Sequence, residues 1–346
     1  LESGKIPEAT KNEMLNLVNE GLEDRCITRD MDWGFDIPWK ELELSSDYDD
    51  KVFYVWFDAP IGYISFTREY FAEQGKEEEW VNYWKSEEAN TVYSMGKDNA
   101  IFHAIIWPAI LSGTKDNYNL PDRINVHQFL NAKDVKFSKS RGKGLTSEKA
   151  LEILPADYWR FYLSSILPVG KDKTFSWKDF EKKINGELND NIGNFVNRVL
   201  SLAEKIGNKV PDTELREEDE NVLKEIEEMI EEYKEDFQSY DIVSAFKTAL
   251  NVSRKGNAYI GEQEPWKNEE IYDQVIYTSL CIVKATALLM YPFIPESSRK
   301  IWNMLNLNSD IELKDKKRDV RLQGGRKLGE KEVLFEKVDS EELKSQ

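Results

Sequence analysis

The chain has 346 residues, of which 40% are hydrophobic and 32% are charged, which is enough for two or three domains with separate cores. Its net charge of −18 argues against non-specific binding of nucleic acid, because the summed field repels phosphate. Two cysteines and two histidines favour neither a disulfide framework nor a metal site built from these residues, and they fit a reducing cytoplasm.

The first half of the chain alternates between predicted strands and helices. Short apolar, β-branched and aromatic runs predict strands at residues 52–57, 91–95 and 124–127. Between the last two, a largely apolar helix is predicted, with Asp98 as its N-cap and a kink or an end at Pro108. This βαβ order favours a parallel sheet that binds ligands at the carboxyl ends of its strands.

Unusual residues follow each of these predicted strands. Residues 58–63 follow the first strand, and residues 96–98 follow the second. The loop after the third strand contains two lysines and two serines: Lys136, Ser138, Lys139 and Ser140. Ammonium groups and hydroxyls in such a loop bind polyphosphate oxygens, although the loop taken alone could be a solvated basic turn. The sequence therefore predicts a nucleotide site where the three loops meet.

The second half of the chain is predicted to be a helical bundle, joined to the first half near residues 167–173. Apolar residues recur with a 3.6-residue period over 184–206, and again over 222–237, where the opposite face is acidic. Residues 279–295 form the longest apolar run. Because Lys284 interrupts this run, we expect a buried helix rather than a membrane span.

Two polar residues lie on the outer face of the first predicted helix of this half. Asn194 and Arg198 are four residues apart and opposite the apolar stripe, so they project together into solvent. An amide and a guanidinium in this arrangement can contact unstacked bases, whereas the alternative is an ordinary solvated face. Trp266 follows Pro265 at a predicted helix start, and alone it would indicate an anchor between helices.

Several of these segments together resemble one family. Residues 136–140, with the sequence Lys-Phe-Ser-Lys-Ser, resemble the lysine-rich signature loop of class I aminoacyl-tRNA synthetases. Residues 55–63 look like the amino-acid pocket segment of the methionyl-tRNA synthetases, and residues 96–108 are similar to the next segment of that family. The order and spacing of these segments agree from about residue 27 to residue 305.

The resemblance implies the second half of a Rossmann-like class I catalytic domain, followed by an α-helical anticodon-binding bundle. Five parts are expected. They are the end of a connective insertion (1–31), the second half of the catalytic domain (32–145), a connecting region that contacts the tRNA stem (146–173), the anticodon-binding domain (174–305) and a returning tail (306–346).

The activity implied by the resemblance is that of a cytoplasmic methionine–tRNA ligase, which uses ATP with Mg²⁺ as a substrate. Methionine carboxylate would attack the α-phosphate of ATP, so catalysis would consist of positioning and neutralisation of charge. Lys136 and Lys139 would be catalytic and would bind the departing phosphates. The implied ATP site comprises Gly96, Asp98, Lys136, Phe137, Ser138, Lys139 and Ser140, with Phe137 in place of the family's usual methionine.

The resemblance also implies where methionine and tRNA bind. A pocket for a thioether should be aromatic, and Trp56, Tyr63, Phe102 and Trp107 supply rings, although such rings also form ordinary cores. The methionine pocket is implied to be lined by Trp56, Ala59, Pro60, Tyr63 and His103. The residues that match the family's anticodon contacts are Asn194, Arg198 and Trp266.

The chain departs from the family at one signature. The His-x-Gly-His motif of class I synthetases is absent, as are the first strands of the sheet and the family's zinc-binding knuckle, so no zinc site is expected. These departures predict a fragment that needs the N-terminal half of the catalytic domain as a partner. One alternative is a non-catalytic tRNA-binding protein derived from a synthetase. A synthetase for another apolar amino acid is disfavoured by the aromatic lining.

Overall fold

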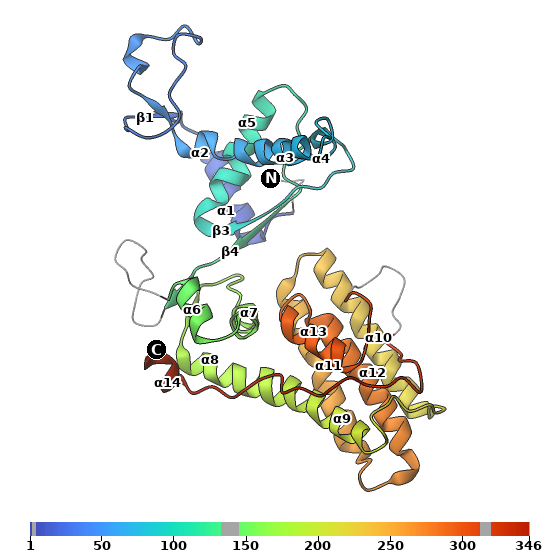
Figure 1. The fold of residues 1–346 in the computed structure, drawn as a ribbon. Helices are drawn as coiled ribbons and strands as arrows, with labels where there is room; N and C mark the ends of the chain where they lie inside the picture. Colours follow the sequence, from blue (N-terminus) through green and yellow to red (C-terminus); the bar gives the residue numbers. More distant parts are fainter. Residues whose placement is uncertain (2–4, 133–144, 312–319, 346) are drawn as a thin grey trace. The chain divides into compact units, whose positions relative to one another are not determined.

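The computed structural model describes residue 1 and residues 5–132, 145–311 and 320–345. The chain divides into two compact units (Figure 1). Unit 1 comprises Leu1–Phe129 with Pro168–Lys171, and unit 2 comprises Leu130–Leu167 with Asp172–Gln346.

Unit 1 mixes short strands with helices. Its elements are α1 (Glu8–Glu20), β1 (Thr28–Arg29), a 3₁₀ turn (Ser46–Tyr48), β2 (Val52–Phe53), α2 (Val55–Asp58), α3 (Ile61–Glu73), α4 (Trp80–Trp84), β3 (Val92–Gly96), a 3₁₀ turn (Lys97–Asn99), a π-helical segment (Phe102–Ile106), α5 (Trp107–Gly113) and β4 (Arg123–His127).

The predicted parallel βαβ unit is confirmed. Strands β3 and β4 pair in parallel, with Val92 opposite Arg123 and Gly96 opposite His127. The carboxyl ends of both strands therefore lie side by side, as a parallel ladder requires. Two small apolar clusters support the unit: one is built around Ala100, Ile124 and Val126, and the other around Tyr93 and Trp107.

Two details of the predicted strands and helices were wrong. The strand predicted at residues 52–57 covers only β2, because its partner β1 is two residues long and the chain then turns into α2. The amide of Phe57 bonds to the carbonyl of Tyr54 at 2.8 Å instead of to a neighbouring strand. Asp98 does not cap a helix with its side chain, because it lies inside the 3₁₀ turn that follows β3. Periodicity alone cannot separate a short strand from a buried helix.

Unit 2 is predominantly helical. Its elements are β5 (Leu130–Ala132), α6 (Ser147–Ile153), α7 (Ala156–Ser165), β6 (Lys173–Phe175), α8 (Trp177–Lys183), a π-helical segment (Ile184–Gly193), α9 (Asn194–Glu204), α10 (Glu217–Gln238), α11 (Ile242–Gln263), a 3₁₀ turn (Glu269–Ile271), α12 (Tyr272–Met290), α13 (Pro295–Met304) and α14 (Ser340–Ser345).

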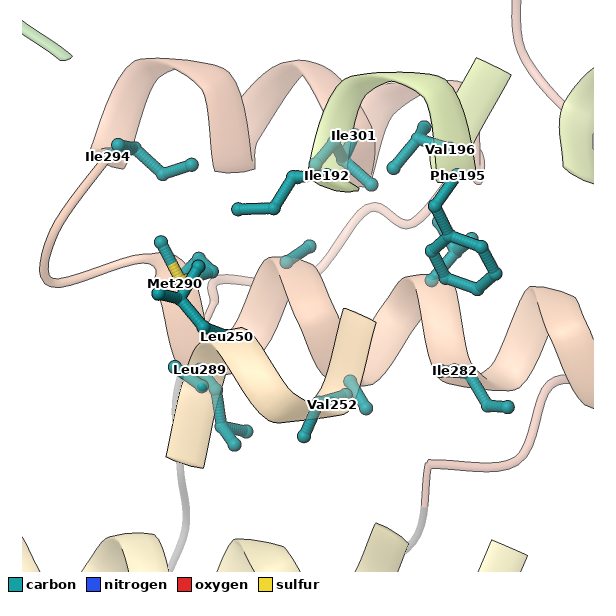
Figure 2. Packing of buried hydrophobic residues seen from close by; sticks show 14 of the residues in the cluster. Ile192, Phe195, Val196, Leu250, Val252, Ile282, Leu289, Met290, Ile294 and Ile301 are labelled. Carbon is teal, nitrogen blue, oxygen red and sulfur yellow. The ribbon is translucent and has the colours of Figure 1, made fainter. Parts of the chain in front are cut away.

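One continuous apolar core holds the helices of unit 2 together. Figure 2 shows part of it, where Ile192 and Phe195 point toward side chains from α11, α12 and α13. The predicted apolar stripe is confirmed, since Ile184, Leu188 and Ile192 are fully buried. The helical run begins earlier than predicted, at Trp177, and its middle part is π-helical.

The helix α12 is the centre of this core. Residues 269–290 are long and apolar enough to cross a membrane, but 72% of the relevant window is buried inside the structure. The core helix of a soluble protein meets the same length and composition criteria, so the segment is weak evidence for a membrane span. The prediction of a buried helix here is confirmed.

Residues 330–339, which lack regular secondary structure, lie along α8 and α9 (dark red in Figure 1). Asn185 fastens this tail by donating to the Val338 carbonyl at 2.8 Å and accepting from the Val338 amide at 2.9 Å. Tyr158 accepts a hydrogen bond from the Glu336 amide at 2.8 Å. The tail is thus part of the packed unit.

A buried carboxylate joins the start of α10 to α11. Asp219 is fully buried and accepts two hydrogen bonds from the Arg216 guanidinium, at 2.9 and 2.6 Å, and one from the Tyr259 hydroxyl. Burial alone would raise the pKa of Asp219, but the hydrogen bonds from Arg216 and Tyr259 outweigh burial and hold this pKa below its ordinary value.

We expect Asp219→Asn to lower the free energy of unfolding by about 2–4 kcal/mol at pH 7, because a buried charge pair loses one partner. A carboxyl with a lowered folded pKa stabilises the fold above its unfolded pKa, so the difference should shrink as the pH falls below about 4. Urea unfolding followed by circular dichroism at several pH values measures both effects.

Glu218→Gln is the matched control, because the Glu218 side chain is 69% exposed and pairs with the same arginine. We expect it to cost less than about 1 kcal/mol. Equal losses in the two variants, or a difference that does not change with pH, would contradict the role of Asp219.

Candidate functional site

Aromatic side chains from three segments of unit 1 converge on His103. Trp56 comes from α2, Tyr63 from α3, and Phe102 and His103 from the π-helical segment after β3. The rings of Trp56 and Phe102 stack with their centroids 4.3 Å apart, and Trp56 meets His103 edge-on at 6.2 Å. The structure therefore brings together three of the five predicted pocket residues, Trp56, Tyr63 and His103.

The hydrogen bonds of His103 define its tautomer. Its Nδ1 lies 3.1 Å from the carbonyl oxygen of Asn99, which can only accept, so Nδ1 carries the proton. Nε2 lies 3.0 Å from the Tyr63 hydroxyl and accepts its proton. Burial lowers the pKa of His103 below its ordinary value, partly opposed by the bond to Asn99. The site thus presents a neutral imidazole at neutral pH.

The cluster has a supporting layer that includes a residue missed by the sequence reasoning. Tyr93 of β3 lies with its ring 5.5 Å from Tyr63 and 5.3 Å from His103, and its hydroxyl accepts a hydrogen bond from Trp107 at 2.9 Å. Burial raises the pKa of Tyr93 to about 12. The alternation of β3, which places Tyr93 and Met95 on one face, was the available signal. Trp107 is 1% exposed and belongs to the core.

Ala59 and Pro60 lie in the turn between α2 and α3. Ala59 is exposed at the end of α2, and Pro60 is buried at the start of α3. Pro60 suits this position because a helix start needs no amide donor there. The turn sets the direction of α3, and therefore the placement of Tyr63 relative to Trp56.

The carboxyl ends of β3 and β4 hold the described part of the predicted nucleotide site. Gly96 lies opposite His127, and a Cβ at position 96 would lie 2.7 Å from Oδ1 of Asp98. A larger residue at position 96 would therefore require the Asp98 carboxylate to move. Lys97 places its ammonium group 4.5 Å from the centre of the Phe129 ring. The lysine-serine residues Lys136, Phe137, Ser138, Lys139 and Ser140 lie outside the described residues.

A second group of predicted residues meets in unit 2. The guanidinium of Arg198 lies 4.4 Å from the centre of the Trp266 ring, within the range of a cation–π contact. Trp266 is 41% exposed. Asn194 is exposed one turn before Arg198 and donates to Asp190 at 3.3 Å. Arg198 and Trp266, which are 68 positions apart in sequence, form one surface with Asn194 nearby on α9.

Metal ligands are sparse in the part of the chain that the structure describes. Among these residues, no group of three or more His, Cys, Asp or Glu side chains could hold a metal ion. The two described clusters are aromatic and cationic instead.

Two family models together match most of the chain. The family model of class I tRNA synthetases (M) matches residues 2–200, and the model of the anticodon binding domain of methionyl tRNA ligase matches residues 210–346. The methionine–tRNA ligase of Korarchaeum cryptofilum is 38% identical over 99% of this chain and 60% of its own length. That of Pyrococcus horikoshii is 39% identical over 96% of this chain and 47% of its own length.

A similar solved structure is that of Mycobacterium tuberculosis methionyl-tRNA synthetase bound by methionyl-adenylate. It has a TM-score of 0.81 and 28% identity, over 96% of this chain and 64% of that protein. The chain thus spans 60% or less of the two curated relatives described.

We expect the pKa of His103 to lie below 6.5, because burial disfavours the charged ring. We also expect the neutral ring to carry its proton on Nδ1, because the backbone carbonyl oxygen of Asn99 can only accept a hydrogen bond. Long-range ¹H–¹⁵N NMR of the imidazoles measures both properties, and the chain has only two histidines to assign. His103→Gln identifies the signal. A pKa of 6.5 or above, or an Nε2–H tautomer, would contradict the geometry.

Proposed function

Because the chain belongs to the class I tRNA synthetases of the methionyl type, we propose that it supplies the methionine pocket, part of the ATP site and the anticodon-binding surface of a methionine–tRNA ligase. The proposed reaction joins methionine and MgATP to methionyl-adenylate and then transfers methionine to methionine tRNA. The observation that carries this proposal is the convergence of Trp56 and Tyr63 on the neutral imidazole of His103.

The pocket chemistry suits a thioether. Methionine's sulfur is polarizable and only a weak acceptor, so ring edges and a neutral histidine solvate it without a competing charge. A protonated His103 would favour an anionic or strongly polar side chain instead. Ala59 and Pro60, in the turn that joins Trp56 to Tyr63, complete the proposed lining.

The ATP site is proposed at the carboxyl ends of β3 and β4. Gly96 ends β3 without a side chain, and the Asp98 carboxylate beside it is proposed to accept hydrogen bonds from ribose hydroxyls. Lys136 and Lys139 are proposed to neutralise the charge on the departing pyrophosphate, and Phe137, Ser138 and Ser140 of the same sequence motif are proposed to contribute to the ATP site. Mg²⁺ enters with ATP as part of the substrate.

The anticodon contacts are proposed at Asn194, Arg198 and Trp266. The partly exposed Trp266 ring and the Arg198 guanidinium beside it offer an aromatic and cationic surface for unstacked bases, and the Asn194 amide offers base-edge hydrogen bonds. Trp266 lies within residues 210–346, which match an anticodon-binding family, and this match supports its assignment. Asn194 and Arg198 lie outside that match, and their assignment is supported by the contact of Arg198 with Trp266. The proposed compartment is the cytoplasm.

Exchange of labelled pyrophosphate into ATP tests the activation step. The chain would be assayed alone and mixed with the part of the catalytic domain that the relatives have and this chain does not span. In the exchanging sample, we expect Trp56→Ala to raise the KM for methionine about tenfold or more, because a stacked aromatic wall is lost. The rate at saturating methionine should change much less.

Trp56→Phe is the control, since it keeps a ring against Phe102 and should retain most of the affinity. An unchanged KM for methionine in Trp56→Ala would show that Trp56 is a packing residue and does not line the methionine pocket. Absence of methionine-dependent exchange in every mixture, with tRNA still bound, would favour the non-catalytic tRNA-binding protein.

We expect Arg198→Ala to weaken binding of methionine tRNA by about 10-fold to 100-fold, because loss of a stacking surface costs roughly 1–3 kcal/mol per base. Filter binding at fixed salt measures the affinity, and pyrophosphate exchange should be unaffected.

Arg299→Ala is the matched control, because Arg299 makes a similar contact with Tyr291 at 5.1 Å in the same unit. We expect it to leave tRNA affinity within about twofold of the parent. A similar loss in both variants would indicate a general charge effect rather than a specific surface.

A further inference from the structure

The proposed anticodon surface begins directly after an unusual stretch of helix. Residues Ile184–Gly193 form a π-helical segment, and Asn194 is the first residue of the α-helix that follows. π-Helical turns are rare and occur often at functional sites, where they reorient the side chains that follow them. The register of Asn194 and Arg198 therefore depends on what stabilises this segment.

A side chain from α11 binds the last turn of the π-helical segment. Asn257 places its Nδ2 2.9 Å from the Asn191 carbonyl oxygen and 3.1 Å from the Asn191 side-chain oxygen. The same nitrogen lies 3.2 Å from the Ser253 carbonyl oxygen. Two backbone carbonyls so close to one atom require a donor, which fixes the orientation of the amide. Asn257 is half-buried.

The neighbouring residue of α11 allows close packing on the other side of Asn194. A Cβ at position 256 would overlap the ring of Phe195, so Gly256 lets α11 approach this ring directly. Phe195 is fully buried, and Figure 2 shows it pointing from its helix into the core. Asn191, three positions before Asn194, and Phe195, directly after it, thus both contact consecutive residues of α11.

The same helix leads to the third residue of the surface. The helix α11 continues to Gln263 and ends at Glu264, which has a left-handed backbone conformation with φ of 41°. Pro265 and Trp266 follow at once, and Arg198 lies over the Trp266 ring. One rigid helix therefore fixes both sides of the proposed anticodon surface.

We propose that Asn257 and Gly256 are positioning residues that set the register of Asn194 and Arg198 relative to Trp266, and thereby the base specificity of tRNA recognition. This inference rests on the proposed function. Neither residue needs to touch RNA. They act by holding the π-helical segment and Phe195 against the helix that precedes Trp266.

Asn257→Asp and Asn257→Ala test the inference in the full chain. Both remove the amide donor, the first with little change of size and the second without added charge. We expect about tenfold weaker binding of methionine tRNA, and a smaller ratio between its affinity and that of the same tRNA with one anticodon base changed. Misplaced side chains lose contacts with the bases more than contacts with the RNA phosphate backbone. Discrimination between anticodon bases therefore falls together with affinity.

Asn251→Asp is the matched control, because Asn251 lies on the same helix, is exposed and accepts a hydrogen bond from Arg254 at 2.9 Å. We expect it to retain affinity and discrimination. Circular dichroism at the assay temperature establishes that each variant is folded. Pyrophosphate exchange in the mixture described above should be the same for all three variants.

Arg198→Ala separates the positioning role of Asn257 from the anticodon surface itself. If this variant loses tRNA binding while both Asn257 variants keep parental affinity and discrimination, the positioning role is overturned and the anticodon surface stands. If Arg198→Ala binds tRNA normally, the anticodon surface itself fails. Loss of affinity in the folded Asn257 variants by the same factor for every anticodon sequence would also overturn the inference.

Discussion

The single apolar core of unit 2 is the constraint on which the rest of that unit depends. It buries residues from α7 to α14 in one continuous cluster, including Phe195 next to Asn194 and Ile260 six residues before Trp266. Since interiors are close-packed, the helices that carry the polar surface residues cannot shift independently. The apolar stripe, through its contacts, therefore determines where the exposed polar residues point.

Unit 1 is organised differently, because polar aromatic contacts take the place of a large core. Its apolar residues form two small clusters, and a chain of hydrogen bonds runs beside them from Asn99 through His103 to Tyr63. Trp107 and Tyr93 form a second, buried pair next to this chain. Such a network orients rings more specifically than apolar packing alone, because each hydrogen bond forms only within a narrow range of distances and angles.

The sequence predicted the helical half and the β3–β4 unit well, because both depend on patterns that persist over many residues. It failed at residues 52–57, where a short apolar run becomes a helix once its partner strand ends, and at Asp98, where local turn geometry decides. The helix start predicted at Trp266 was also wrong, because Trp266 lies in a turn and α12 begins at Tyr272. The contact of Arg198 with Trp266 needed tertiary information, since 68 positions separate them. Tyr93 was missed because the alternation of β3 indicates which face Tyr93 lies on, but not that Tyr63 and His103 pack against that face.

The tail of unit 2 has a consequence for the order of folding. Tyr158 bonds to Glu336 across 178 positions, and Asn185 bonds to Val338 across 153. Contacts so distant in sequence raise the contact order and slow folding relative to a simple helical bundle. During synthesis, α7 and α8 emerge long before their partners in the tail, so the helical unit reaches its final packing only after residues 330–339 have left the ribosome.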